Sequence, residues 1–266
     1  MKRKGTHRPS IEDCVEMSGI ETLHPGGFAL TRRTAELAGL RPGMKVLDVS
    51  SGRGTQSIFY AKEFGARVTG LDLSDEMVDT ARRSAEAAGI AGLVEFVKGD
   101  SQRLPFPDNA FDAVINECAV GIPDDSQRVL SEMVRVLRPG GAIAIHESTW
   151  KKDIPNCEKE ELSERYGTSP LERGEWISLL KKAGAREIAA EFERWSKPEM
   201  FWKVRRDRDV KSHRSVLSLG ERVPLLVRIL GRYGLRGIRT ALKNEKVFYS
   251  AVKDGKLGYC LYTGIK

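Results

Sequence analysis

The sequence predicts an α/β fold built on a doubly wound, mostly parallel sheet. Between residues 44 and 149, short apolar strand patterns alternate with helix patterns. Glycine-containing turns separate the successive segments, and the helical stretches have the 10–15 residues typical of crossovers between parallel strands. Because such crossovers are right-handed, we expect helices on both faces of the sheet.

Each segment of this alternation has its own signals. The first strand, "KVLDVS", leads into a helix that we expect to end at Gly65. The second strand, "ARVTGLDLS", leads into a helix capped by Ser74 and closed by Gly89. Further strands are predicted at "LVEFVKGD", "FDAVINECAV" and "AIAIHES", with the helix "SQRVLSEMVRVL" before the last of them.

After Trp150 we expect the helix "LERGEWISLLKKAG", the strand "AREIAAEFERW" and the closing strand "KLGYCLYTGIK". This order predicts cap helices in residues 1–41, a core of residues 42–194 plus 257–266, and an inserted helical segment, 195–256. We expect the insertion to form a substrate lid. Its helical pattern is expected to break at Pro224, Gly231, Gly234 and Gly237.

Composition narrows the class of protein. The 266 residues are 40% hydrophobic, but no apolar run approaches the roughly 20 residues of a membrane-spanning helix. No apolar signal core follows the basic first residues. The four cysteines are far apart and form no CxxC pair. We therefore expect a cytoplasmic protein with reduced thiols, and we predict no metal ligands.

Positive charge gathers in one segment. The whole chain carries +7, whereas Trp195 to Lys256 holds 16 Lys and Arg against 6 Asp and Glu, a local balance of 16 − 6 = +10. Arginines 228, 232, 236 and 239 recur there at helical spacing beside apolar residues. This pattern favours an anionic, partly apolar small molecule as acceptor, or contact of residues 222–243 with an anionic membrane surface. A solvated basic face over a packed stripe is the alternative. Nucleic acid is not favoured, because no aromatic-interleaved motif is present, and the sequence does not indicate an oligomeric state.

The loop in "VLDVSSGRGT" indicates the kind of ligand. A dinucleotide fingerprint requires three spaced glycines, but only Gly52 and Gly54 are present and Ser57 takes the third position. Asp48, just before the loop, would repel a pyrophosphate. The same carboxylate suits S-adenosylmethionine, which carries an ammonium and a sulfonium.

Two further carboxylates end the next strands. Asp72 is placed to accept hydrogen bonds from both ribose hydroxyls, and Asp100, with Ser101 beside it, from an adenine amino group. Each alone could be a solvated turn residue. The ordered series is stronger, because ligands of open α/β sheets bind at the carboxyl edge of the strands.

The run from Pro42 to Glu147 resembles the class I S-adenosylmethionine-dependent methyltransferases, especially the small-molecule group that includes quinone-biosynthesis and arsenite methyltransferase-like enzymes. The resemblance rests on "VLDVSSGRGT", "GLDLSDEMV", "LPFPDNAFDAV" and "MVRVLRPGGAIAIHE". It implies a Rossmann-like fold with an antiparallel last strand and S-adenosylmethionine as cofactor. The implied cofactor contacts are Asp48, Ser50, Ser51, Gly52, Gly54, Asp72, Leu73, Asp100, Ser101 and Asn116, with Asn116 near the sulfonium.

Ser50 departs from this resemblance, because the family usually has glycine there. If the loop requires a positive φ at this position, the serine costs energy; if it requires only a small side chain, the serine is harmless. With Gly52 and Gly54 in place, we expect cofactor binding to be preserved.

Three residues are weak candidates for catalysis. His24, in "LHPGGF", and Glu117, after the fourth strand, are candidate bases, each with the alternative of an ordinary loop residue. Cys118 resembles a cysteine of the arsenite methyltransferase-like branch and suits a soft metalloid, with Cys157 as a partner, or else is a pocket-lining thiol. His146, which ends the fifth strand, either lines the pocket or caps the strand.

These observations predict an enzyme that transfers a methyl group from S-adenosylmethionine to a small molecule. An arsenite or thiol-type methyltransferase that uses Cys118 is one alternative. An RNA methyltransferase that uses the basic segment is another. A third alternative is an S-adenosylmethionine-binding protein that has lost catalytic activity, which the replacement of glycine by Ser50 would indicate.

Overall fold

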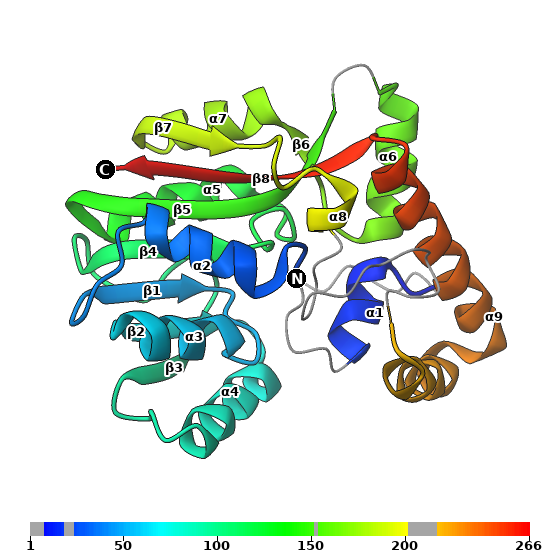
Figure 1. Ribbon diagram of the computed structural model, residues 1–266, viewed down its shortest axis with the longest axis horizontal. Helices are drawn as coiled ribbons and strands as arrows, with labels where there is room; N and C mark the ends of the chain where they lie inside the picture. Colours follow the sequence, from blue (N-terminus) through cyan, green and yellow to red (C-terminus); the bar gives the residue numbers. More distant parts are fainter. Residues whose placement is uncertain (1–7, 19–23, 152–153, 202–216) are drawn as a thin grey trace.

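A mixed sheet with the strand order β3-β2-β1-β4-β5-β8-β7 forms the centre of the molecule (Figure 1). The computed structural model describes residues 8–18, 24–151, 154–201 and 217–266. Its strands are β1 (Lys45–Val49), β2 (Arg67–Asp72), β3 (Val94–Lys98), β4 (Phe111–Glu117), β5 (Leu137–Trp150), β6 (Leu171–Glu172), β7 (Arg186–Glu191) and β8 (Leu257–Ile265). The order reverses direction beside β1, where β2 lies on one side and β4 on the other.

Strands β1 to β5 run parallel to their neighbours, whereas β8 runs antiparallel to both β5 and β7. The predicted doubly wound sheet with an antiparallel last strand is therefore confirmed. The helices are α1 (Ile11–Ser18), α2 (Gly27–Leu37), α3 (Thr55–Phe64), α4 (Asp75–Ala87), α5 (Ser126–Val136), α6 (Asn156–Tyr166), α7 (Arg173–Lys182), α8 (Pro198–Phe201) and α9 (Leu219–Lys253).

Alternation along the central strand divides the core into two layers. Val46 of β1 faces the layer formed with α2, α3 and α4, whereas Leu47 and Val49 face the layer formed with α5 and α7. Successive side chains of a strand point to opposite faces, so this one strand contributes to both layers. Asp48 shares the face of Val46 and therefore points towards α3.

Helix α9 is more continuous than the sequence analysis predicted. The expected breaks at Pro224, Gly231 and Gly237 do not occur, and the backbone leaves helical geometry only at Gly234 (φ 65°, ψ −168°). Pro224 lies near the start of the helix and removes a hydrogen bond to the carbonyl of Gly220. That residue is exposed, so water can replace the lost donor.

Helix α6 was missed because its sequence, "NCEKEELSERY", is almost entirely polar. Only Leu162 and Tyr166 of this helix are buried. These two join Trp150 of β5 and Val252 of α9 in a third apolar cluster beside the end of the sheet. Tertiary packing thus stabilises a helix that carries little amphipathic signal of its own.

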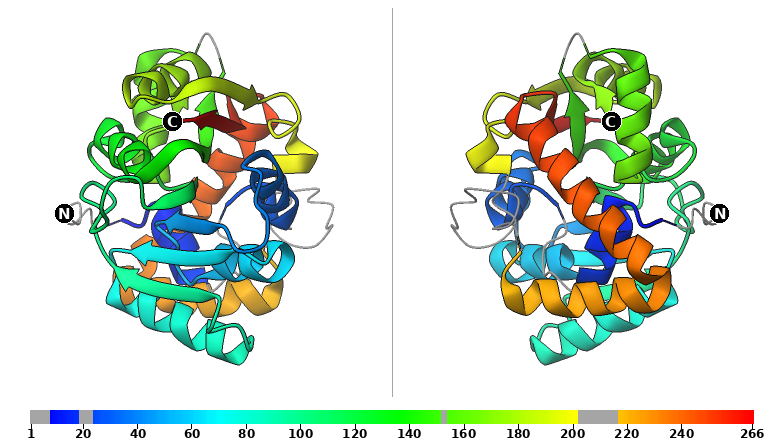
Figure 2. Two further views of the ribbon diagram at one scale, coloured as in Figure 1. Left: turned by 90° about the vertical axis from the view of Figure 1, so that its left-hand side faces the viewer. Right: turned by 90° about the vertical axis from the view of Figure 1, so that its right-hand side faces the viewer.

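Helices α1 and α9 come from opposite ends of the chain and lie side by side (Figure 2). The side chain of Arg228 donates to the carbonyl of Met17 (2.6 Å), and the amide of Asn244 donates to the carbonyl of Pro9 (3.1 Å). A small apolar cluster that includes Leu225 and Ile229 of α9 packs against Cys14 and Met17 of α1. Within the described ranges, no helix combines the length and the apolar character needed to cross a membrane.

Candidate functional site

The loop between β1 and α3 lies at the carboxyl edge of the sheet and is tied to the end of β2. The backbone N–H of Gly52 donates to Oδ2 of Asp72 (2.9 Å), and the N–H of Ser74 donates to Oδ1 of the same carboxylate (2.9 Å). The N–H of Ser51 donates to the carbonyl of Leu71 (2.9 Å). Each carboxylate oxygen of Asp72 retains a lone pair, so it can still accept from a ligand hydroxyl.

Ser50 adopts a left-handed backbone conformation with φ 61°. The loop therefore needs a positive φ at the position where the family usually has glycine, and not merely a small side chain. A non-glycine residue in this region carries roughly 1–2 kcal/mol of strain.

The two glycines of the loop have different roles. A Cβ atom on Gly54 (φ 78°) would lie 2.5 Å from the ring of Phe96 and 2.9 Å from Ala81, so this position is filled by the protein. A Cβ atom on Gly52 (φ 53°) would meet nothing within 4 Å. The backbone at Gly52 therefore borders open space, where a ligand can approach it closely.

Asp48 is buried, and Ser57 of α3 donates to its Oδ2 (2.6 Å). Burial raises the pKa of Asp48 to about 7, although the hydrogen bond from Ser57 opposes this rise. A carboxyl group that is only partly ionised near neutral pH suits a ligand that brings its own positive charge. Together with the open space at Gly52, this fits the cationic methionine end of S-adenosylmethionine.

The side chains of two predicted cofactor residues, Asn116 and Ser51, are directed into the protein. The side-chain amide of Asn116 donates to the carbonyl of Val49 (2.9 Å) and accepts from the N–H of Ala119 (3.0 Å). The hydroxyl of Ser51 lies against β2, 2.8 Å from where a Cβ atom on Gly70 would be. It is buried without a hydrogen-bond partner.

The remaining predicted cofactor residues lie at the ends of β2 and β3. Leu73 is 60% exposed, which is unusual for a leucine and leaves its side chain available to cover a nucleoside. Asp100 accepts a hydrogen bond from the N–H of Gln102 (2.9 Å), and Ser101 beside it is buried. Both residues follow the carboxyl end of β3, the edge of the sheet at which the glycine loop lies.

Beside the glycine loop, the side chains of His24, Glu117 and His146 form a buried polar cluster. Nε2 of His24 lies 2.7 Å from Oε2 of Glu117, and Nε2 of His146 lies 3.2 Å from the same oxygen. All three side chains are almost fully buried, and the two imidazole centroids are 4.6 Å apart. Two further donors hold the carboxylate: Thr31 to Oε2 (2.9 Å) and Tyr60 to Oε1.

Both imidazoles are fixed through their second nitrogen. Nδ1 of His24 lies 2.8 Å from the carbonyl oxygen of Pro25, which can only accept, so this nitrogen carries a proton. Nδ1 of His146 lies 2.8 Å from the hydroxyl of Tyr259. Each ring therefore directs Nε2 towards Glu117.

Burial and mutual charge determine the protonation of this polar cluster. Burial opposes ionisation of Glu117, but His146 and His24 hold its pKa well below the usual range. Burial also opposes a charge on His24, yet the Glu117 carboxylate outweighs it and raises the pKa of His24. For His146, burial dominates and lowers the pKa. The charged forms of His24 and Glu117 therefore stabilise each other, whereas the neutral form is favoured at His146.

The sequence predicted His24 and Glu117 as separate candidates and His146 as a residue that ends the fifth strand and either lines the pocket or caps the strand. His146 lies within β5 instead, four residues before its end at Trp150. The sequence did not identify Tyr60 or Thr31, because a tyrosine and a threonine within amphipathic helices carry no local signal of a polar contact. Only the packing of α2 and α3 against the sheet brings them to Glu117.

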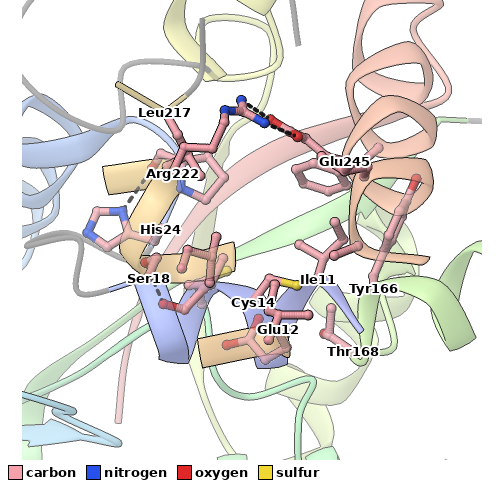
Figure 3. Close-up of a pocket in the computed structure, with 18 of the residues that line it drawn as sticks. Ile11, Glu12, Cys14, Ser18, His24, Tyr166, Thr168, Leu217, Arg222 and Glu245 are labelled. Carbon is pink, nitrogen blue, oxygen red and sulfur yellow. Dashed lines mark hydrogen bonds and ion pairs between the residues drawn. The ribbon is translucent and has the colours of Figure 1, made fainter. Parts of the chain in front are cut away.

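A cavity opens beside this polar cluster, between α1 and α9 (Figure 3). We call it the α1–α9 cavity; its volume, including the open solvent at its mouth, is about 1160 Å³. Most of its wall is apolar, with Ile11, Val15, Phe201, Leu225, Ile229 and Phe248 among the lining residues. Arg222 and Glu245 also line it and pair with each other (2.7 Å). His24 and Cys118 line it as well, so the cavity reaches the carboxyl end of β4.

The cysteines are distributed unevenly around this cavity. Cys118, with φ 63°, and Cys14 both line it, whereas Cys157 is exposed on α6 and is not part of its wall. Burial raises the pKa of Cys118 well above its usual value and that of Cys14 to about 12. Both thiols are therefore protonated at neutral pH.

Residues 46–141 match the family model described as a methyltransferase domain. This range contains the glycine loop, Asp72 and Asp100, and it ends within β5. Residues 46–141 of this chain form a class I S-adenosylmethionine-dependent methyltransferase domain. The predicted resemblance to this family is thereby confirmed for residues 46–141.

The methyltransferase domain is similar to curated small-molecule enzymes. The chain is 40% identical over 146 residues to sterol 24-C-methyltransferase ERG6B of Gibberella zeae, which covers 54% of this chain and 37% of that protein. It is 37% identical over 118 residues to the ubiquinone/menaquinone biosynthesis C-methyltransferase UbiE of Shewanella halifaxensis, which covers 44% of this chain and 47% of that protein. The chain thus spans less than half the length of these relatives.

The whole fold is similar to that of a solved structure of the [4+2]-cyclase SpnF. The TM-score is 0.75 at 21% identity, and 99% of each chain is covered. At this identity the similarity concerns the fold. It includes the segments on either side of the methyltransferase domain, which form the α1–α9 cavity.

Proposed function

We propose that this chain transfers the methyl group of S-adenosylmethionine to an apolar small molecule bound in the α1–α9 cavity. The observation that carries the proposal is the position of the cavity. Its wall includes Cys118, the first residue after β4, and it therefore reaches the sheet edge where the glycine loop and Asp48 lie. An acceptor in this cavity would lie next to the methyl donor.

The chemistry of the wall supports an apolar acceptor. Side chains such as Ile229, Phe201 and Phe248 offer no hydrogen bonds, and burial of apolar surface is the main source of affinity in such a cavity. Arg222 is already paired with Glu245, so an anionic group inside the cavity would have to compete for it. The similar proteins are named for sterols and for ubiquinone or menaquinone, and the proposed acceptor belongs to the same general class of ring-containing lipids.

Methyl transfer from a sulfonium needs little covalent help from the protein. The bound cofactor supplies the electrophilic methyl group, and the residues of this chain orient the reactants and exclude water. His24 donates through Nδ1 and is paired through Nε2. Its imidazole is therefore held at both nitrogens, and it can act as a base only if the contact with Glu117 opens.

A trivalent metalloid remains a second candidate acceptor, because Cys14 and Cys118 line the same cavity. The expected partner of Cys118 was Cys157, which lies elsewhere on the exposed side of α6. Soft metals bind thiolates, and burial keeps both lining thiols protonated. The distant position of Cys157 and the protonated state of the two lining thiols favour an apolar acceptor over arsenite.

We propose that the described part of the insertion, residues 195–201 and 217–256, covers the acceptor as a lid; residues 202–216 of the predicted insertion lie outside the described residues. We also propose that the outer face of α9 contacts an anionic membrane surface. Leu219, Val223, Val227 and Leu230 form an exposed apolar stripe on this helix. The segment from 226 to 244 adds several arginines and a lysine and contains no acidic residue. An apolar stripe beside cationic side chains suits the interface of an anionic leaflet. A cytoplasmic protein that takes an apolar acceptor from such a surface is consistent with both features.

The proposal is tested by turnover with labelled S-adenosylmethionine against sterols, quinones, isoprenoid diphosphates and arsenite, with S-adenosylhomocysteine as the common product. Ala241→Trp would fill the cavity, because Ala241 lines it. Lys181→Trp, at an exposed position of α7, is the control. We expect Ala241→Trp to abolish turnover of the active acceptor without weakening S-adenosylhomocysteine binding, and Lys181→Trp to leave turnover unchanged.

Equal activity of the two variants would refute the acceptor site. If the wild-type chain binds S-adenosylhomocysteine but methylates arsenite and none of the lipids, the acceptor is a metalloid and the proposal of an apolar acceptor is wrong. If it binds S-adenosylhomocysteine but methylates nothing in the panel, the result favours the inactive cofactor-binding protein.

A further inference from the structure

We propose that His24, Glu117 and His146 form a binding site for one divalent transition-metal ion beside the α1–α9 cavity. The three side chains come from the segment before α2, the end of β4 and the middle of β5. One ligand atom from each lies within 4.8 Å of the other two. Two imidazoles and one carboxylate form a ligand set suited to zinc, manganese, iron or cobalt rather than to calcium.

The distances between the ligand atoms are close to those of a loaded site. Zinc–nitrogen and zinc–oxygen bonds of about 2.0–2.1 Å place tetrahedral ligand atoms about 3.3 Å apart. Nε2 of His146 is 3.2 Å from Oε2 of Glu117, and Nε2 of His24 is 2.7 Å from it. The His24 contact has to open by about half an ångström to admit an ion, and all three ligand atoms lie within 4.8 Å of one another.

The surroundings of the three side chains resemble the outer shell of a metal site. Metal-binding histidines usually engage their second nitrogen with a carbonyl or hydroxyl group, which fixes the ring and its tautomer. His24 does so with the carbonyl of Pro25, and His146 with the hydroxyl of Tyr259. Thr31 and Tyr60 hold the carboxylate of Glu117 in the same way.

One buried atom is left unsatisfied without an ion. Nε2 of His146 is fully buried and makes no hydrogen bond, although Glu117 lies near it. A buried polar atom without a partner costs free energy. A metal ion at the centre of the three side chains would give this nitrogen a partner and would also neutralise the Glu117 carboxylate.

The proposed ion would be accessible from the cavity, because His24 lines it. Its remaining coordination positions could hold water or an oxygen atom of a bound molecule. Metal binding itself is independent of methyl transfer. Only a role for the ion in polarising an acceptor oxygen would depend on the proposed function.

The test uses tag-free, chelator-treated full-length protein, titrated with Zn²⁺ and Mn²⁺ by calorimetry and with Co²⁺ by visible absorption. Binding of S-adenosylhomocysteine serves as the check of folding. We expect one ion per chain. Glu117→Gln and His146→Ala should each weaken binding at least roughly 100-fold. Tyr259→Phe removes the partner of His146 Nδ1, together with the contacts of that hydroxyl to the carbonyl of His146 and to Cys118, and should weaken binding by roughly 10-fold. Glu147→Gln is the matched control, because this buried carboxyl accepts from the N–H of Val120 instead.

X-ray absorption of the wild-type zinc complex gives a readout that needs no variant and no enzymatic activity. The proposal predicts nitrogen and oxygen neighbours at about 2.0–2.1 Å, with the pattern of two imidazoles. Sulfur neighbours at about 2.3 Å would assign the ion to the cysteines and overturn the proposal. A folded wild-type chain that takes up none of the three ions at millimolar concentration would also overturn it, leaving a buried ion pair only.

Discussion

The carboxylate of Asp72, at the end of β2, accepts a hydrogen bond from the backbone N–H of Gly52, in the loop that follows β1 (2.9 Å). The residue expected to bind the ribose is therefore also the residue that holds the glycine loop in position. Its second oxygen accepts from the N–H of Ser74, the residue that caps α4. A change at Asp72 should consequently affect the loop as well as the nucleoside.

Asp72→Asn should weaken S-adenosylhomocysteine binding at least roughly tenfold, since the amide replaces one charged acceptor with a donor. Unfolding free energy should fall by about 1 kcal/mol through the lost loop contact. Titration calorimetry and chemical denaturation measure the two effects. Asp75→Asn is the control, because Asp75 is 72% exposed and pairs only with Lys98 at the surface. Unchanged affinity in Asp72→Asn would contradict the cofactor assignment.

Ser50→Gly should stabilise the chain by about 0.5–1 kcal/mol. Relief of roughly 1–2 kcal/mol of left-handed strain exceeds the up to about 1 kcal/mol of chain entropy that the glycine gains on unfolding. Denaturant titration checks this value. Ser50→Ala keeps the strain and removes the hydroxyl, so the pair of variants separates backbone from side chain. If both weaken cofactor binding to the same extent, the hydroxyl is a ligand contact.

Cofactor affinity should depend on pH through Asp48. Its pKa in the folded chain is raised to about 7 from 3.8, so below pH 7 a proton must leave before the carboxylate can pair with a cation. The dissociation constant of S-adenosylmethionine should therefore fall by up to about tenfold per unit as the pH rises from about 5 to 7, and level off above it. Calorimetry in buffers of different ionisation enthalpy would detect the released proton. Asp48→Asn should bind weakly and without this slope.

The same raised pKa has the opposite effect on the stability of the cofactor-free chain. Above pH 3.8 the unfolded chain loses the proton that the folded chain keeps until about pH 7. The contribution of Asp48 to the free energy of unfolding is thus complete at low pH and is lost as the pH rises through this window.

The outer face of α9 should bind vesicles that contain anionic lipid. Val227→Asp, at a side chain that is 63% exposed, should reduce co-sedimentation several-fold and change the unfolding free energy by no more than about 0.5 kcal/mol. Arg232→Glu should have a similar effect, and added salt should weaken binding. Lys181→Glu on α7 makes the same charge change elsewhere and should have none. Equal binding to zwitterionic vesicles would argue against an electrostatic contribution.

The features that the sequence predicted well are local ones. The strand and helix alternation, the Ser74 cap and the loop around Gly52 follow from side-chain pattern and turn chemistry within short windows. The carboxyl ends of parallel strands meet at one edge, so the placement of Asp48 and Asp72 followed from topology as well.

The features that could not be predicted depend on packing between distant segments. The contact of His24 and His146 with one oxygen of Glu117 requires the segment before α2 to fold over two strands. The sequence did not predict the left-handed conformation of Ser50, because serine is compatible with either loop geometry. Likewise α6, which has almost no apolar face, is fixed only by its partners.

Because α1 pairs with α9, different segments of the sequence bind the methyl donor and form the walls of the acceptor cavity. The loop and strand-end residues assigned to the methyl donor lie in one continuous stretch of the core, whereas both long walls of the adjoining chamber come from segments outside it. Substitutions in α1 and α9 can reshape the chamber without touching Asp48, Gly52 or Asp72. Selectivity for the acceptor can therefore be exchanged, by mutation or by grafting these two helices together, while the handling of the methyl donor is retained.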